Sequence, residues 1–387
     1  MQQKTASVFN ITVIVAALGY FVDIYDLLLF NIVREPSIKD LGITEATAIV
    51  AASTKIINWQ MVGLFIGGVV WGIMGDRRGR LSVLFGSILL YSAANFLTGF
   101  VNDIDQYKWA RFVAGIGLFG AVFAYFTFDY TQDWRLCYKI GGGLGVVLLL
   151  LRISVAESGM FKQVKTQQNV TRGNLLMFFT NATRFRKYIF AILIGLPTWF
   201  VIGVLVNLSN HFAAALYGDN KIASGKATMF AYAGIAIGDI LIGFVSQYFK
   251  SRKKALYLFY ALSILSGILF FSAWNTNDTR MYSICTLLGF STGFWAIFVT
   301  IGAEQFGTNL RATAATTIPN MVRGSLPLIN MLFKGLFMDS WKWGIVKSAV
   351  VTGIIVMVVT LIAAYFTEET FHKDLNYVEG EQAAPPA

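Results

Sequence analysis

The sequence predicts an all-α membrane protein that crosses the bilayer many times. Of its 387 residues, 56% are hydrophobic and only 13% are charged, whereas about 25% of a soluble globular chain is charged. The charged residues gather in short segments between long apolar runs. A chain this poor in charge faces lipid over much of its surface, where helices satisfy the backbone hydrogen bonds internally.

Long apolar runs predict the spanning helices, because about 20 apolar residues cross the hydrocarbon core. Eleven runs approach or exceed that length: Ile11–Val33, Ile56–Met74, Leu81–Val101, Lys108–Phe128, Leu136–Val155, Tyr188–Leu216, Ala227–Phe249, Ala255–Trp274, Met281–Ile301, Ala312–Phe337 and Gly344–Phe366. Glycine is frequent within these runs, as expected where helices pack closely in lipid.

A polar stretch from Glu157 to Lys187 divides the runs into two groups. We therefore expect an N-terminal helical bundle over residues 1–155, shortened at 108–128, and a cytoplasmic linker over 156–187. A C-terminal six-helix bundle over 188–370 and a polar tail over 371–387 follow. The apolar patch Leu175–Phe179 within the linker is expected to lie on the membrane surface.

The loop charges predict the orientation of the chain. Basic segments at 76–80, 162–187 and 250–254 are expected in the cytoplasm, and acidic segments at 102–107 and 129–134 outside, by the positive-inside rule. Both termini are then cytoplasmic, and we expect the chain in a bacterial inner membrane. This distribution also accounts for the net charge of +10 without nucleic acid as a partner, which would need a continuous basic face.

The run Lys108–Phe128 conflicts with this orientation, because one run lies between two loops that are both expected outside. One explanation is a re-entrant hairpin that turns near Gly117–Gly120, where glycine tolerates the dihedrals of a tight turn. Another, compatible with the first, is an internal deletion of roughly thirty residues near residues 117–121, two half-spans and a loop. A single straight span in a mis-oriented half is the third explanation.

The segment Gly72–Arg80 reads Gly-Ile-Met-Gly-Asp-Arg-Arg-Gly-Arg. It resembles the signature Gly-x-x-x-Asp-Arg-x-Gly-Arg that the major facilitator superfamily carries between its second and third helices, and it departs from the family at Leu81. The resemblance implies a gating motif that helps to close the cytoplasmic side, formed by Gly72, Asp76, Arg77, Gly79 and Arg80. The alternative is an ordinary basic loop.

Three further stretches resemble the metabolite:proton symporter branch of this superfamily: Gly19–Asp26, Arg111–Gly117 and Ala303–Thr313. The resemblance covers nearly the whole chain. It breaks near Gly117–Gly120 and weakens in the second half, where Gln247 stands at the aspartate position of the signature. It implies two bundles of inverted repeats around a site near the membrane midplane, with the first bundle shortened here.

Asp23 and Asp26 lie three residues apart inside the first apolar run, so they share one helix face. A charge at the centre of a spanning helix costs about 2.5–3.5 kcal/mol, which favours an inward-facing pair with a function. We interpret Asp23, Asp26 and Arg111 as proton-coupling residues. Two alternatives remain: a static pair bound to Arg111 or to helix amides, and an Arg111 that snorkels outward near Lys108.

Other polar side chains within the apolar runs are candidates for the substrate cavity: Tyr25, Trp199, Asn207, Asn210, Asn320 and Asn330. The alternative for Asn320 and Asn330 is a hydrogen bond to a neighbouring helix, and the alternative for Asn210 is a position near the outer surface. His211 is expected near the outer surface, and Asp239 is expected to pair within its own half. Glu304 and Arg311 are candidates for a cytoplasmic gate, with a structural ion pair as the alternative.

The resemblance implies a proton-coupled symporter that moves a small organic metabolite by alternating access, and an anionic substrate is consistent with it. The expected partners are this substrate, the proton and the lipid bilayer, and we expect a monomer. Two cysteines and two histidines offer no metal-ligand spacing, so no metal and no cofactor is expected. The second hypothesis is a truncated, transport-inactive relative or a scaffold. A membrane-embedded enzyme is less favoured because no nucleophile–base signature is present, and a channel because no filter-like repeat is present.

Overall fold

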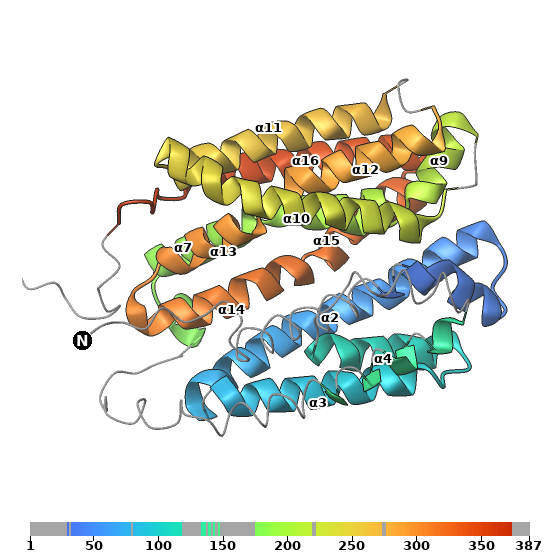
Figure 1. Cartoon of the computed structure of the whole chain (residues 1–387), viewed down its shortest axis with the longest axis horizontal. Helices are drawn as coiled ribbons and strands as arrows, with labels where there is room; N and C mark the ends of the chain where they lie inside the picture. Colours follow the sequence, from blue (N-terminus) through green and yellow to red (C-terminus); the bar gives the residue numbers. More distant parts are fainter. Residues whose placement is uncertain are drawn as a thin grey trace, which may run out of the picture. The chain divides into compact units, whose positions relative to one another are not determined.

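The computed structural model describes residues 29–30, 32–78, 80–117, 133–136, 138–140, 142–143, 146–147, 175–218, 222–272 and 276–373, which form helices and their connections with no strand among them (Figure 1). The prediction of an all-α chain is confirmed. The chain divides into two compact units. The N-terminal unit comprises Met1–Gly67 with Arg78–Val170, and the C-terminal unit Gly68–Arg77 with Thr171–Ala387.

Six helical stretches in the described part of the chain are long and apolar enough to cross a membrane. They are Thr47–Trp71, Ala182–Val206, Ser224–Phe249, Arg252–Phe271, Asp278–Glu304 and Ile345–Phe366. Each overlaps one of the apolar runs identified in the sequence. The total of eleven spans and the domain boundaries drawn from the sequence stay predictions.

The N-terminal unit begins, in its described part, with helical residues 29–40, of which residue 31 is outside the description. The expected end of this helix at Val33 is wrong, because the helix continues to Asp40. Burial explains the extension: Arg34, Ser37 and Ile38 are all fully buried. The hydroxyl of Ser37 donates to the carbonyl oxygen of Arg34 at 3.0 Å, so this buried hydroxyl is satisfied within the helix.

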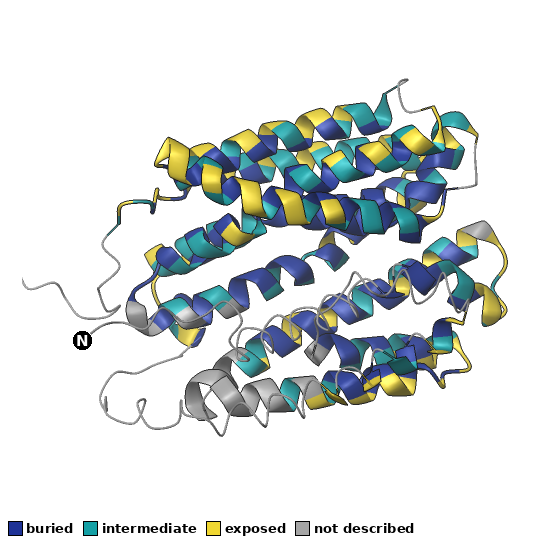
Figure 2. Ribbon diagram, viewed as in Figure 1, coloured by how far each residue is buried: buried dark blue, intermediate teal, exposed yellow. Residues whose placement is uncertain are grey.

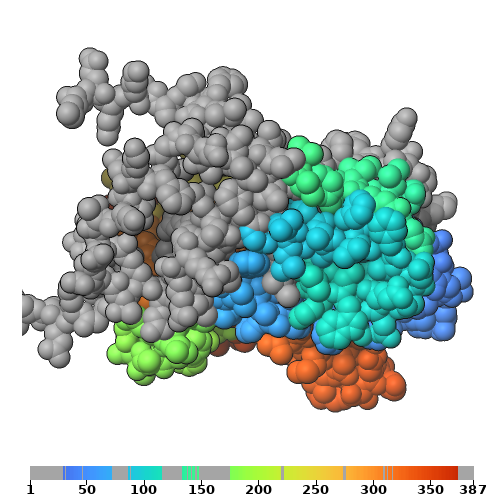
Figure 3. Space-filling model, turned by 90° about the horizontal axis from the view of Figure 1, so that it is seen from below, coloured from blue at the N-terminus to red at the C-terminus, as the bar shows by residue number. Residues whose placement is uncertain are grey.

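Three longer helices follow: α2 (Ala46–Arg78), of which Gly68–Arg77 belongs to the C-terminal unit, α3 (Arg80–Thr98) and α4 (Ile104–Gly117). α3 and α4 pack side by side, and their surfaces adjoin on the face seen in Figure 3. α2 and α4 approach each other through glycines. A Cβ added to Gly63 would lie 2.1 Å from the carbonyl oxygen of Phe112, and one added to Gly115 would lie 2.2 Å from that of Gln60. Small residues allow this close backbone approach between membrane helices.

The signature segment lies in helix ends rather than in an extended loop. α2 runs through Arg78 and α3 begins at Arg80, so the expected loop over 76–80 is shorter than the sequence suggested. Gly79 lies outside the described residues. The side chains of Asp76, Arg77 and Arg80 and the surroundings of Gly72 also lie outside the description, so the gating role of this motif stays a prediction.

The C-terminal unit contains a longer series of helices, coloured by burial in Figure 2. They are η2 (Leu175–Phe178), α7 (Ala182–Leu193), α8 (Leu196–Phe200), η3 (Val201–Val206), α9 (Ser209–Tyr217), α10 (Ser224–Phe249), α11 (Arg252–Phe271), α12 (Asp278–Thr292), α13 (Trp295–Glu304), α14 (Thr308–Gly324), α15 (Leu326–Asn330), η4 (Met331–Ser340) and α16 (Ile345–Phe366). η2 is a 3₁₀-helix, whereas η3 and η4 are π-helices.

Several apolar runs that the sequence presents as continuous are interrupted in the structure. The run 281–301 is divided into α12 and α13 by Gly293 and Phe294. The run 188–216 is divided after α7, where Pro197 lies in the first turn of α8. Proline is frequent in the first turn of a helix, because the N–H groups there have no partner within the helix and the N–H that proline lacks is not missed. Interruptions of this kind leave backbone groups that only neighbouring helices can satisfy in a membrane.

The apolar patch of the linker packs onto its own unit. Phe178 is fully buried, and its ring stacks on Tyr188 with centroids 4.5 Å apart. The ring of Phe306 also packs against that of Phe178, with centroids 4.8 Å apart. Leu176 and Phe179 on the other face are exposed, so this face alone remains available for the membrane surface.

Candidate functional site

Arg111 is the central polar residue of the N-terminal unit. Its side chain is fully buried, so the alternative in which it snorkels outward is wrong. One guanidinium nitrogen, Nη1, donates to Oδ1 of Asn95 at 2.7 Å, and the guanidinium carbon lies 5.1 Å from the centroid of the Tyr138 ring. A buried charge is costly unless it is hydrogen-bonded, and the Asn95 amide oxygen and the Tyr138 ring both stabilise the cation.

A line of buried hydroxyl groups extends from Tyr138. Its hydroxyl oxygen lies 2.9 Å from that of Tyr107, which in turn lies 3.2 Å from the hydroxyl oxygen of Ser37. All three residues are fully buried. The Tyr107 ring also stacks on Trp134 with centroids 5.5 Å apart. These contacts fix Tyr138 beneath Arg111 and tie the helix that ends at Asp40 to α4.

The C-terminal unit also holds a buried arginine, Arg323 in α14, with 7% of its surface exposed. Its Nη1 donates to Oδ1 of Asn320 at 2.8 Å, and its guanidinium carbon lies 5.2 Å above the Trp295 ring. The sequence analysis predicted Asn320 as a residue of the substrate cavity but did not include Arg323. The available signal was an arginine in the middle of the apolar run 312–337, which is expensive in lipid and therefore suggests a function.

The other predicted cavity residues of this unit are also buried or nearly so. The exposed fractions are 5% for Trp199, 3% for Asn207, 9% for Asn210 and 6% for Asn330. The Asn207 amide donates to the carbonyl oxygen of Gly203, four residues earlier in the same helical stretch, at 3.5 Å. Trp199 lies in α8, between Gly195, which contacts Val322, and Gly203, which contacts Leu326. α8 therefore packs against the end of α14 that carries Arg323, and η3 lies against the start of α15.

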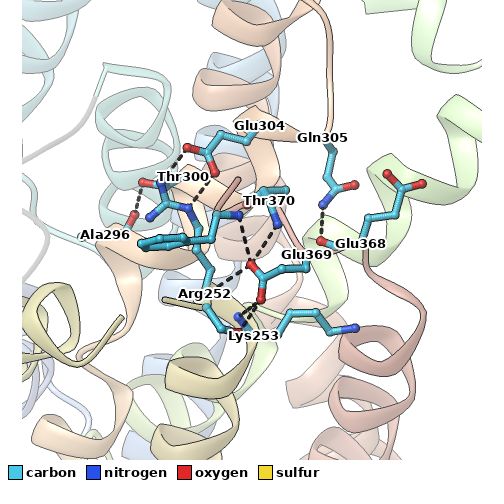
Figure 4. Close-up of polar contacts among 11 residues, drawn as sticks. Arg252, Lys253, Ala296, Thr300, Glu304, Gln305, Glu368, Glu369 and Thr370 are labelled. Carbon is cyan, nitrogen blue, oxygen red and sulfur yellow. Dashed lines mark hydrogen bonds and ion pairs between the residues drawn. The ribbon is translucent and has the colours of Figure 1, made fainter. Parts of the chain in front are cut away.

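A polar cluster gathers where α10 turns into α11 (Figure 4). We call it the Arg252 cluster; its members are Ser251, Arg252, Lys253, Glu304 and Glu369. Arg252 donates from Nε and Nη2 to the two carboxylate oxygens of Glu304 at 2.7 and 2.8 Å. This two-pronged geometry is the strong form of an arginine–carboxylate pair. It joins the start of α11 to the end of α13.

Glu369 connects the chain beyond α16 to the same cluster. It accepts hydrogen bonds from the Ser251 hydroxyl, from the backbone N–H groups of Arg252 and Lys253, both at 3.1 Å, and from that of Thr370 at 2.9 Å. Burial raises the pKa of this carboxyl, but the hydrogen bonds outweigh burial and the net pKa is lowered. A carboxylate at the N-terminus of α11 also complements the helix dipole.

The predicted gate residues have different partners. Glu304 is paired with Arg252, which the sequence analysis treated only as part of a basic loop. Arg311 donates to the carbonyl oxygen of Phe306 at 3.4 Å from Nε and at 3.3 Å from Nη2. The proton-coupling candidates Asp23 and Asp26, together with Tyr25, lie outside the described residues, as does the expected hairpin beyond Gly117. In the described part of the chain no group of three or more His, Cys, Asp or Glu side chains has metal-binding geometry.

Solved structures with the same fold are transporters. The chain matches the proton:xylose symporter XylE with a TM-score of 0.68 and 15% identity, over 96% of this chain and 98% of that one. It matches the nucleoside transporter NupG with a TM-score of 0.62 and 13% identity, over 92% of this chain and 98% of that one. At these identities the likeness establishes the fold, which is that of the major facilitator superfamily.

The sequence matches agree with the fold. The family model described as "Sugar (and other) transporter" matches residues 12–121. A putative metabolite transport protein of Haemophilus influenzae is 23% identical over 350 residues, 80% of this chain and 84% of that protein. The chain thus has the fold of the major facilitator superfamily, and the proteins that it resembles in sequence and fold are transporters, not enzymes.

Within that superfamily the chain is similar to transporters of small metabolites. The gentisate transporter of Corynebacterium glutamicum is 23% identical, over 76% of this chain and 73% of that protein. The niacin transporter NiaP of Acinetobacter baylyi is 22% identical, over 78% of this chain and 81% of that protein.

Proposed function

We propose that this protein is a proton-coupled symporter that takes up a small organic carboxylate by alternating access. The observation that carries the proposal is Arg111, a fully buried arginine whose guanidinium donates to Asn95 and lies over the Tyr138 ring. A cation held in this way attracts a carboxylate strongly, because electrostatic interactions are less screened in a low-dielectric interior.

Arg323 supports the same class of substrate from the C-terminal unit. It is buried, and its described contacts are again a neutral amide and an aromatic ring. Guanidinium groups suit carboxylates because their N–H donors match the two carboxylate oxygens. The named substrates of two relatives, gentisate and cis,cis-muconate, are carboxylates, and niacin is ionised as a carboxylate at neutral pH.

Asp23 and Asp26 carry the coupled proton in this proposal. Arg111 then interacts with the ionised acids in one state of the transport cycle and with the substrate carboxylate in another. The Arg252 cluster lies on the cytoplasmic side of an inner-membrane protein with both termini inside, and together with the 72–80 signature it stabilises the state closed to the cytoplasm. The protein works as a monomer.

Uptake measurements test the proposal directly. The protein is reconstituted in proteoliposomes, and radiolabelled gentisate, niacin and cis,cis-muconate are offered with an inward proton gradient. We expect accumulation of at least one of them, its loss on adding a protonophore, and its loss in Arg111→Gln and Asp26→Asn. Arg135→Gln is the matched control, because Arg135 is a partly exposed arginine of the same unit that pairs with Asp40.

Two results contradict the proposal. Correctly folded protein that moves none of the three carboxylates favours the transport-inactive relative. Uptake that persists with a protonophore, or in Asp26→Asn, excludes coupling to protons through these residues.

A further inference from the structure

Asp239 is an acidic residue in the interior of α10, far from both helix ends. Its Oδ1 accepts a hydrogen bond from the backbone N–H of Ala296 at 3.0 Å. Ala296 is the second residue of α13. The residue that precedes this helix, Phe294, supplies no side-chain hydrogen bond to the helix start, so an aspartate from the neighbouring helix caps α13 instead.

The contact is possible because α10 and α12 touch through their backbones. A Cβ added to Gly289 would lie 1.8 Å from the carbonyl oxygen of Ala231, and one added to Gly234 would lie 2.1 Å from that of Thr286. Gly293, at the break between α12 and α13, lies directly against Gly238 and the backbone nitrogen of Asp239. The backbone of Asp239 therefore lies beside the break between α12 and α13, and its side chain caps the helix that begins there.

The other side of the break is satisfied by α11. The hydroxyl of Ser263 donates to the carbonyl oxygen of Ser291 at 3.0 Å, and the hydroxyl oxygens of Ser266 and Ser291 lie 3.1 Å apart. Hydroxyl groups thus satisfy the end of α12, and a carboxylate satisfies the beginning of α13. Of these groups only the carboxylate changes its charge when it binds a proton.

α13 connects this break to two places already described. Its first residue, Trp295, lies beneath the guanidinium of Arg323. Its last residue, Glu304, takes the two hydrogen bonds of Arg252. A change at the start of α13 therefore acts on both the buried arginine and the Arg252 cluster.

We propose that Asp239 is a proton-binding residue of the transport cycle, and that its ionised carboxylate stabilises the N-terminal end of α13. On binding one proton the carboxylate becomes a neutral acid, and the charge-assisted hydrogen bond from Ala296 becomes a neutral one of about half the strength. The start of α13, with Trp295 beneath Arg323, is then less firmly held. This goes beyond the proposed function, which places the coupled proton in the N-terminal unit.

The elements that pack against α10 are η3, α9, α11, α12 and α13. In the described chain their charged and titratable residues are His211 and Tyr217 on α9, Arg252, Lys253, Lys254, Tyr257 and Tyr260 on α11, Asp278, Arg280, Tyr282 and Cys285 on α12, and Glu304 on α13; α10 itself adds Lys226, Tyr232 and Tyr248. Most stand toward the ends of their elements. Cys285 is buried within α12, two turns before Gly293. The cation linked to Asp239 by described contacts is Arg323, through Trp295.

Infrared difference spectroscopy tests proton binding without any substrate. Spectra of the reconstituted protein are compared between neutral and acidic pH, so that carboxyl groups that bind a proton appear in the difference. We expect a protonated carboxyl band that is lost in Asp239→Asn and kept in Asp339→Asn, the matched control at the exposed pair with Lys334. A wild-type spectrum that Asp239→Asn leaves unchanged would overturn the assignment.

Hydrogen exchange tests the fastening of α13. The amide oxygen of Asp239→Asn still accepts a hydrogen bond but carries no charge, so this variant imitates the protonated state at every pH. We expect exchange at residues 294–298, corrected for intrinsic rates, to rise about fivefold in the wild type on acidification and to be high and independent of pH in Asp239→Asn. Equal, pH-independent protection in both proteins would show that Asp239 is only a structural cap. Neither measurement uses substrate, so failure here and failure of the uptake experiment are separate results.

Discussion

Arg252 and Glu304 form a two-pronged ion pair with side chains only 18% and 11% exposed. The pair joins the start of α11 to the end of α13, two helices separated in sequence by all of α12. Its geometry and burial distinguish it from the exposed ion pairs elsewhere in the chain, such as Lys334 with Asp339, where the acid is 57% exposed.

We predict that this pair contributes measurably to stability. A double-mutant cycle with Arg252→Ala and Glu304→Ala should give a coupling energy of about 1–3 kcal/mol, because both groups are largely removed from water. The same cycle with Lys334→Ala and Asp339→Ala is the control and should give at most about 0.5 kcal/mol. The measurement is thermal or denaturant unfolding in detergent. Equal coupling energies at the two sites would contradict the prediction.

The acid dependence of stability should report on Glu369. Its pKa is lowered in the folded protein, since hydrogen bonds from Ser251 and the backbone outweigh the effect of burial. A lowered folded pKa contributes stability above the ordinary range of a glutamate, and this stability is lost as the pH falls through the folded pKa.

Accordingly, Glu369→Gln should melt at a lower temperature than the wild type at neutral pH, and the difference should vanish in acid, below the folded pKa. Ser251→Ala, which removes one donor and leaves the acid in place, should fall between the two. A constant difference between the wild type and Glu369→Gln across the whole pH range would show that charge is not the cause.

Glycine packing between α10 and α12 should tolerate no side chain. Gly289→Ala places a methyl group 1.8 Å from the carbonyl oxygen of Ala231, so the helices must separate, at a cost of about 1–3 kcal/mol. Gly267→Ala is the matched control, because a Cβ there meets nothing within 4 Å. That control should be neutral or stabilising, since alanine favours a helix over glycine by about 1 kcal/mol. Chemical denaturation of both variants checks the difference.

A charge placed at Asn95 should weaken substrate binding by Arg111. Asn95→Asp preserves the shape of the acceptor but turns the 2.7 Å hydrogen bond into an ion pair, so the guanidinium attracts a carboxylate substrate less strongly. We expect uptake of whichever carboxylate the wild type transports to fall at least about tenfold, while the melting temperature does not fall. Asn95→Ala separates charge from contact: it should lower the stability by about 2 kcal/mol by removing an acceptor from a buried cation. Normal uptake by a folded Asn95→Asp protein would remove Arg111 from the substrate site.

Hydropathy was sufficient to predict an all-helical membrane chain, because the length of an apolar run depends on the local sequence alone. The places where runs break depend on other helices. Gly293 marks the end of α12, but no side chain within 281–301 caps α13 at Trp295, because its cap is Asp239 of α10. The helix that ends at Asp40 was cut short at Val33 for the same reason, since the burial of Arg34 and Ser37 is a property of the folded unit.

The candidate site was predicted unevenly. Arg111 was selected from a motif, but its neutral partners Asn95 and Tyr138 could not be, because neither is marked by its own sequence surroundings. Arg323 was missed although its signal was local. Glu304 was selected without Arg252, since the turn that aims Arg252 at α13 depends on Lys250 adopting a left-handed conformation with φ of 48°.

The π-helices η3 and η4 let the C-terminal unit tolerate the loss of a residue at these two places. A π-helix holds one more residue per wide turn than an α-helix of the same span. Losing a single residue from 331–340 would let that stretch relax into ordinary α-helix, while the same loss within α12 would rotate every following side chain by about 100°. Evolutionary insertions and deletions in membrane-crossing segments of this unit should therefore collect in η3 and η4 and avoid α12.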